Sequence, residues 1–321
     1  MNIVIGSRGS QLALWQANWV KDRLTEAGHE AVVEIIRTSG DKLQSYPPAE
    51  PLPASLAQIV AEAGTKGLFI KEIEEALLSG QVDLAVHSLK DLPTTLPAGL
   101  ILAAVPPRED ARDVFISAGA NAFEQLPPGA CVGTSSPRRQ AQVRWFRPDL
   151  KLVPVRGNLT TRLRKLESGD YDALVLAAAG IHRLGLRDRI TAYFSFDQMC
   201  PAVGQGALAI QIRESDATLA RAVAPLDDPL THLAVRAERA MLLRLGGGCQ
   251  VPIAAHANVE EAQLRLRGIV AATDGSRLIR GAANGPRGDP ESLGAAVAED
   301  LIGKGAGEIL SIGRSGDRVI G

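Results

Sequence analysis

Apolar residues at the start of the chain change from a short run to a helical stripe and back to a run. Residues 3–5 form an apolar run that predicts a buried strand, and 31–36 predict a second. Between them, apolar side chains at helical spacing over 12–24 predict a helix that stops near Gly28. The chain therefore opens with a β-α-β unit.

The alternation of strand and helix patterns continues along the middle of the chain. Strands are predicted over 84–86, 114–116, 131–132, 153–155, 173–176 and 208–212, and helices over 70–78, from Ser136-Pro137 and over 159–166. Alternating strands and helices predict a mainly parallel sheet. The prolines of 38–53 predict a long loop, and Pro106-Pro107 predicts a hinge.

The last third has a different pattern. A long helix is predicted from 229 to about 245, where three glycines end it. Alternation over 264–267 and an alanine-rich helix over 293–302 predict a small α+β domain.

Composition narrows the function classes. A chain of 321 residues predicts two or three domains, and its net charge of −1 predicts no general attraction to nucleic acid or an anionic membrane. Three cysteines predict a reducing compartment, and the start has no basic leader, so we expect a cytoplasmic protein. No cysteine or histidine spacing indicates a metal site.

Two arginines at a predicted helix start are the sharpest local feature. Arg138 and Arg139 lie in the first turn, where the helix end already carries partial positive charge. That placement is unfavourable unless an anion is near, and Thr134, Ser135 and Ser136 add hydroxyl groups. The pattern predicts an anion site; the alternative is a solvated helix start with surface arginines.

Other arginines also come shortly after predicted strands, at the end where open α/β sheets bind ligands; they are Arg8, Arg156, Arg162 and Arg183. The planar guanidinium group binds carboxylates through two hydrogen bonds. The positions that these residues share therefore predict an anionic, carboxylate-rich ligand, although any one of them alone is typical of a surface residue.

Two further segments carry reactive groups. Lys90 and Asp91 follow a strand, so Asp91 could serve as a base or stabilise a developing cation, or could form an ordinary surface pair with Lys90. Cys249 follows three glycines, which indicates a reachable thiol, although most free cysteines are buried and inert. His87 by itself is more typical of a structural role.

Taken together, these segments resemble the hydroxymethylbilane synthase family, also called porphobilinogen deaminase. The resemblance covers nearly the whole chain; its motifs are 6–10, 67–72, 87–93, 108–110, 133–140, 156–158, 201–206 and 247–252. It implies two similar doubly wound, periplasmic-binding-protein-like α/β domains flanking a cleft, plus a small C-terminal α+β domain. The implied limits are 1–106 with 207–224, then 107–206, then 225–321.

The resemblance also implies a reaction. Four porphobilinogen molecules are joined head to tail, with loss of ammonia, to give hydroxymethylbilane for tetrapyrrole biosynthesis. Growth is primed on a dipyrromethane cofactor held by a thioether, and Cys249 matches the attachment position. We expect a monomer that acts on this small molecule, with neither nucleic acid nor membrane as a partner.

Individual roles follow from the same resemblance. Asp91 matches the catalytic carboxylate. The positions that match cofactor contacts are Ser10, Lys90, Thr134, Ser135, Ser136, Arg138, Arg139 and Arg162, and those that match substrate contacts are Arg8, Lys66, Arg156 and Arg183. Thr65 stands where the family commonly has glycine, and the proline-rich loop before it is longer than expected.

Two other functions compete with this one. Two α/β lobes around an anion also suit a solute receptor, although the missing export signal and the glycine-cysteine loop count against it. An acyl- or phosphoryl-transfer enzyme could use the same anion site, and it would need no pyrrole adduct.

Overall fold

The computed structural model describes residues 1–45, 68–246 and 252–315. The chain forms two compact units, Met1–Arg108 with Ala207–His232, and Glu109–Gly206 with Leu233–Gly321, and each is described by itself. The first division falls directly after Arg108, close to the predicted hinge at Pro106-Pro107. The limits expected for three separate domains stay a prediction.

The first unit is built on a five-stranded sheet. Its strands are β1 (Asn2–Ser7), β2 (Glu30–Ile35), β3 (Leu84–Ser88), β4 (Leu100–Ala104) and β10 (Leu208–Arg213), in the order β2-β1-β3-β10-β4. β1 is parallel to β2 and β3, whereas β10 is antiparallel to both of its neighbours. The prediction of a mainly parallel sheet is confirmed, with one reversed strand.

Helices cover both faces of this sheet. The helices are α1 (Gln11–Glu26), α2 (Ser39–Ser45), α4 (Lys71–Leu78) and α8 (Ala217–Val223), and short 3₁₀ turns occupy Leu89–Asp91 and Ala224–Leu226. Side chains of α1 and α8 pack with Ile3 and Ile5 on one face, while α4 packs with Val4 and Ala85 on the other. Successive side chains of a strand point to opposite faces of the sheet, so β1 contributes to the apolar packing on both faces.

One helix forms where a loop was predicted. The prolines predict a loop over 38–53, but α2 forms over Ser39–Ser45, so that prediction is wrong for this stretch. The prolines begin only at Pro47, and Asp41 anchors the start of the helix by accepting hydrogen bonds from the backbone and hydroxyl of Thr38. Such local side-chain bonds favour a helix start.

The second unit contains a five-stranded sheet in which the reversed strand again occupies the fourth position. Its strands are β5 (Asp113–Ser117), β6 (Cys131–Gly133), β7 (Lys151–Val153), β8 (Ala173–Ala177) and β9 (Ala192–Tyr193), in the order β7-β6-β8-β5-β9. β6 is parallel to β7 and β8, and β5 is the reversed strand. The strand predicted over 153–155 ends at Val153, because Pro154 has no N–H to donate.

Helices flank this second sheet as well. The helices are α5 (Pro137–Phe146), α6 (Leu159–Glu167) and α7 (Ala178–Arg183), with 3₁₀ turns at Phe123–Gln125 and Arg187–Arg189. α5 packs through Val143 on one face, whereas α6 and α7 pack through Leu163 and Ile181 on the other. The two five-stranded sheets are therefore doubly wound α/β structures, as the sequence predicts.

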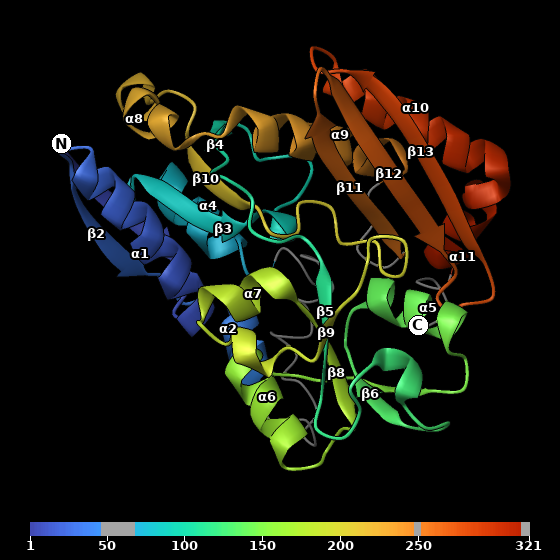
Figure 1. Ribbon diagram of the computed structural model, residues 1–321. Coiled ribbons are helices and arrows are strands. Elements are labelled where there is room, and N and C mark those ends of the chain that lie inside the picture. The colour runs from blue at the N-terminus through green and yellow to red at the C-terminus, as the bar shows by residue number, and fades with distance from the viewer. Residues whose placement is uncertain (46–67, 247–251, 316–321) are drawn as a thin grey trace. The chain divides into compact units, whose positions relative to one another are not determined.

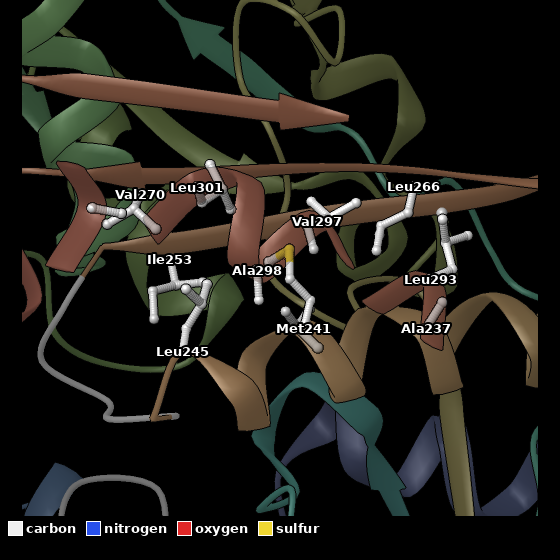
Figure 2. Packing of buried hydrophobic residues seen from close by; sticks show 14 of the residues in the cluster. Ala237, Met241, Leu245, Ile253, Leu266, Val270, Leu293, Val297, Ala298 and Leu301 are labelled. Atoms are coloured by element: carbon white, nitrogen blue, oxygen red, sulfur yellow. The ribbon is translucent and has the colours of Figure 1, made fainter. Parts of the chain in front are cut away.

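The rest of the second unit, which resumes at Leu233, contains a three-stranded antiparallel sheet. It consists of β11 (Ile253–Glu260), β12 (Gln263–Ala271) and β13 (Leu278–Pro286), with α9 (Pro229–Arg244), α10 (Pro290–Leu301), a π-helical turn at Ile302–Ala306 and α11 (Gly307–Ser315) (Figure 1). Figure 2 shows Met241 of α9 directed toward Val297 and Ala298 of α10. This confirms the predicted C-terminal α+β part.

The described helices were also searched for a membrane span. Within these residues, none combines the length and the apolar character that crossing a bilayer requires.

Candidate functional site

The carboxyl ends of β1 and β3 hold the functional side chains of the first unit. Ser10 caps α1 by accepting a hydrogen bond from the backbone of Ala13, 3.3 Å away, so the chain turns immediately after β1. β3 runs into the turn that carries Asp91. Neighbouring parallel strands bring these two turns to the same edge of the sheet.

A pocket of about 90 Å³ lies at this edge. The polar residues that line it are Arg8, Ser10, Gln16, His87, Ser88 and Asp91. The amide of Gln16 donates to the hydroxyl of Ser88 at 2.9 Å, so part of the wall is fixed by internal bonds. Lys90 is half-buried in the same turn. The structure thus brings together three of the predicted residues, namely Arg8, Ser10 and Asp91.

Arg8 is oriented by a carboxylate that the sequence analysis did not identify. Its Nε and Nη2 atoms donate to Oδ1 of Asp41 at 3.1 and 2.5 Å, and the guanidinium lies 4.1 Å from the ring centre of Phe69. Burial raises the pKa of Asp41, but hydrogen bonds from Arg8 and Thr38 outweigh it and leave the pKa below its usual value. Asp41 was missed because its segment was predicted to be a loop.

Burial keeps the imidazole of His87 neutral. It lowers the pKa of His87 to about 4, although the hydrogen bond with Gln211 and the charge of Asp91 act in the opposite direction. At neutral pH, Asp91 therefore lines the same pocket as an uncharged imidazole ring.

This shift predicts a pH-dependent stability. Between pH 6.5 and about 4 the unfolded chain binds a proton that folded His87 does not, so the free energy of unfolding falls as the pH is lowered. The contribution of this group reaches about 3 kcal/mol at the acid end. We expect His87→Gln to flatten the dependence in urea unfolding measured across this range. An equal slope in the wild type and His87→Gln would contradict this assignment.

The second unit presents its hydroxyl groups between β6 and α5. Ser136 caps α5 by accepting from the backbone of Arg139, and Thr134 accepts from the backbone of Ser136. The hydroxyl of Ser135 donates to the carbonyl of Val155 at 2.8 Å and accepts from its N–H at 2.9 Å. These bonds tie the loop to the end of the neighbouring strand.

The protein itself supplies a negative charge to Arg138 and Arg139, through the carboxylate of Asp113. Asp113 is fully buried; its Oδ2 accepts from Arg138 at 2.6 Å, and its Oδ1 accepts from Arg139 at 3.0 and 2.7 Å. Burial raises the pKa of Asp113, but the two guanidinium charges outweigh it and hold the pKa well below its usual value. The sequence analysis missed Asp113, whose only signal is a charge at the start of an apolar strand.

Positive charge remains in excess around this aspartate. Burial lowers the pKa of Arg162, and the charge of Arg139 lowers it further. The Nε atom of Arg162 donates to the carbonyl of Gly157 at 2.9 Å, and the described part of the chain gives it no carboxylate partner. The Nε atom of Arg138 is buried without a hydrogen-bond partner among the described residues. The cluster can therefore accept a further anionic group.

The two remaining arginines differ in exposure. Arg156 is exposed in the turn between β7 and α6. Arg183 is buried at the end of α7, where Nη2 donates to the carbonyl of Gly206 at 2.7 Å, and burial lowers its pKa to about 10. Lys66 and Cys249, predicted for substrate and cofactor, lie outside the described residues.

Comparison with known proteins identifies the family. Residues 3–221 match the family model of the porphobilinogen deaminase dipyrromethane cofactor-binding domain, and 232–303 match that of the porphobilinogen deaminase C-terminal domain. The chain belongs to the porphobilinogen deaminase family. This membership confirms the predicted resemblance and excludes the receptor and the acyl- or phosphoryl-transfer enzyme as the chain's main function.

Curated porphobilinogen deaminases are similar over almost the full length. That of Syntrophotalea carbinolica is 50% identical over 309 residues, covering 96% of this chain and 94% of the relative. That of Desulforudis audaxviator is 50% identical over 317 residues, covering 98% of both. Among solved structures, a periplasmic substrate-binding protein of an ABC transporter from Coxiella burnetii has 14% identity and a TM-score of 0.42, covering 74% of this chain and 96% of that one.

The chemistry of the second unit fits the family's cofactor. The dipyrromethane of a porphobilinogen deaminase is built from substrate and carries acetate and propionate groups. Arg138 and Arg139 share the single carboxylate of Asp113, and the charge of Arg162 acts on Arg139 without a carboxylate partner of its own among the described residues. A buried Arg138 nitrogen also lacks a hydrogen-bond partner among these residues. Acidic pyrroles supply the missing negative charge, so the residues present suit this ligand.

Proposed function

We propose that Asp91 is the catalytic carboxylate of this porphobilinogen deaminase and that Cys249 carries its dipyrromethane. The family's reaction condenses four porphobilinogen molecules head to tail, releasing ammonia and giving hydroxymethylbilane. The observation that carries the proposal for Asp91 is its place in a pocket with Arg8 and Ser10, beside a neutral imidazole.

The charge of Asp91 matches the charge that the reaction develops. When ammonia leaves the aminomethyl group of porphobilinogen, positive charge spreads onto the pyrrole nitrogen. A carboxylate accepts a hydrogen bond from that N–H and stabilises the cation, most strongly where water is excluded. Arg8, held by Asp41, is suited to bind an acetate or propionate of the same ring. Bound dipyrromethane supplies the pyrrole carbon to which the first substrate is joined.

The other binding roles remain those that the sequence predicts. For the cofactor we propose Ser10, Lys90, Thr134, Ser135, Ser136, Arg138, Arg139 and Arg162; for the substrate we propose Arg8, Lys66, Arg156 and Arg183. The exposure of Arg156 supports its role, since its guanidinium is accessible to a carboxylate from solvent. Each charge-assisted hydrogen bond contributes about 1.5–3 kcal/mol, so several together retain a growing polyanion between additions.

The chemistry of the described cysteines supports attachment at Cys249. A thiolate is the nucleophile in thioether formation, and burial raises the pKa of Cys200 to about 12. Burial also raises the pKa of Cys131, with the nearby charge of Asp172 adding to the effect. Neither group therefore forms a thiolate readily at neutral pH.

Intact-mass measurement tests the proposed attachment. We expect the purified protein to be heavier than its chain by one dipyrromethane, with the added mass on the peptide that contains Cys249. Cys249→Ala should show the mass of the bare chain, while the matched control Cys131→Ala should keep the adduct. An unmodified wild type, or an adduct that persists in Cys249→Ala, would overturn the assignment.

Compartment and assembly are also proposed. Three cysteines in 321 residues suit a reducing compartment, which supports the cytoplasm. We expect a monomer whose partner is the small molecule porphobilinogen.

A further inference from the structure

Three buried polar side chains form a line next to the pocket of the first unit. His87 of β3, Gln211 of β10 and Glu74 of α4 are 6%, 0% and 9% exposed. Nε2 of His87 is 3.0 Å from Oε1 of Gln211, and Nε2 of Gln211 is 2.9 Å from Oε1 of Glu74. Gln211 reaches His87 diagonally, because the residue paired with His87 is Ala209, two positions away on the same face.

The hydrogen bonds in this line have a fixed direction. An ionised carboxylate has no hydrogen to give, so Glu74 accepts from the amide nitrogen of Gln211. The amide oxygen of Gln211 then faces His87 and can only accept. The proton of the neutral imidazole must therefore be on Nε2, which leaves Nδ1 with a lone pair.

Burial, rather than the neighbouring charges, opposes a second proton on the ring. Burial lowers the pKa of His87 to about 4, so the ring is neutral at the pH of most enzymes. The charged groups that share the pocket with His87 are Asp91 and Arg8, and Glu74 is separated from the ring by the Gln211 amide. Burial raises the pKa of Glu74, while the bond from Gln211 lowers it. An imidazolium at position 87 would neutralise Asp91, whose negative charge the reaction uses.

We propose that Glu74 is a positioning residue of this enzyme: acting through Gln211, it holds His87 as the neutral Nε2–H tautomer beside Asp91. The Nε2–H tautomer leaves Nδ1 without a proton to donate to Asp91, so the N–H of a bound pyrrole remains the partner of that carboxylate. The inference deepens the role proposed for Asp91 and rests on it. Glu74 and Gln211 themselves are not among the residues that line the pocket.

Nitrogen NMR tests the proposed tautomer directly. The chain has five histidines, so ¹⁵N-histidine labelling of the holoenzyme gives a small set of ring signals, and His87→Asn identifies the pair from His87. In the wild type we expect a protonated Nε2 and an unprotonated Nδ1. Glu74→Met removes the acceptor and lets the Gln211 amide reverse, so the Nδ1–H form should appear. Glu74→Gln retains an oxygen acceptor and should keep the wild-type pattern.

Steady-state kinetics tests the link to the reaction. We expect Glu74→Met to lower kcat roughly tenfold, in the range found when a supporting hydrogen-bond partner is lost, and Glu74→Gln to restore most of it. Gln211→Met interrupts the same line and should reproduce both effects if Glu74→Met does not fold. A general structural role would not separate Glu74→Gln from Glu74→Met in the ring signals.

Each contrary outcome has its own meaning. An unchanged His87 tautomer in Glu74→Met, or in Gln211→Met, overturns the proposal. A changed tautomer with an unchanged kcat overturns the positioning role, and an equal loss in Glu74→Gln and Glu74→Met overturns the acceptor mechanism. The tautomer results do not depend on Asp91, whose own role is decided separately by Asp91→Asn.

Discussion

Asp91→Asn is expected to lower kcat by about 10²–10⁴-fold, the span typical of a group that assists proton transfer or stabilises charge in a transition state. Asparagine has nearly the same shape, so the turn after β3 and the pocket wall should remain intact. The substitution removes the negative charge that faces the developing pyrrole cation. The loss should therefore appear mainly in kcat, with a smaller change in KM.

The experiment is a steady-state assay of porphobilinogen consumption with a matched control. Asp22→Asn makes the same chemical change on an exposed position of α1 in the same unit and should leave turnover unchanged. Unfolding curves of both variants show whether the fold is retained. Turnover of Asp91→Asn within about threefold of the wild type would remove Asp91 from the catalytic role.

Asp113→Asn is expected to lower the free energy of unfolding by about 3–5 kcal/mol, the cost of removing one partner from a buried ion pair. Arg138 and Arg139 are 6% and 7% exposed and both donate to this carboxylate, so the variant leaves two buried guanidinium groups without a counter-charge. Asparagine keeps only one of the two acceptor oxygens, so the measured loss reports on the charge and on the hydrogen bonds of the other oxygen together.

The pH dependence of this effect has a definite sign. The folded protein holds the pKa of Asp113 below its ordinary value of 3.8, so the stabilisation is complete above that pH and is lost as the pH falls below it. The difference between wild type and variant should therefore shrink in strong acid.

Urea unfolding of the two proteins measures the difference. Asp149→Asn is the matched control, because Asp149 pairs with Arg147 near the surface of the same unit, where solvent screens the pair and it contributes little to stability. A loss for Asp113→Asn no greater than that of the control would show that the arginines do not depend on Asp113.

Elements with a strong local pattern were predicted well from the sequence. The apolar run of β1, the helix α1 and the cap at Ser136 each depend on neighbouring residues, and all three elements agree with the structure, although Trp15 of the predicted apolar face is exposed. β10 was predicted from alternation over 208–212, yet residues 208–212 are all buried. The position of the strand was predicted correctly, but the alternation did not predict its burial on both faces, which depends on helices from distant segments.

The site shows the same limit. The sequence indicates that Arg138 and Arg139 need an anion, but nothing local shows that Asp113, 25 residues earlier, supplies it. Likewise, the line from Glu74 through Gln211 to His87 joins residues up to 137 positions apart. Partners of this kind are fixed by strand register and helix packing, which a single sequence does not display.

The place of β10 in the first sheet has a consequence for how the protein is made. β10 lies between β3 and β4, although its residues, Leu208–Arg213, come more than a hundred positions after β4. The N-terminal sheet therefore stays incomplete during synthesis until this late segment leaves the ribosome. The second sheet uses one continuous stretch, Asp113–Tyr193, and all its strands are available earlier than β10. The first sheet can therefore be completed only after every strand of the second has been synthesised, and a nascent chain that ends before residue 208 lacks the strand that pairs with β3 and β4.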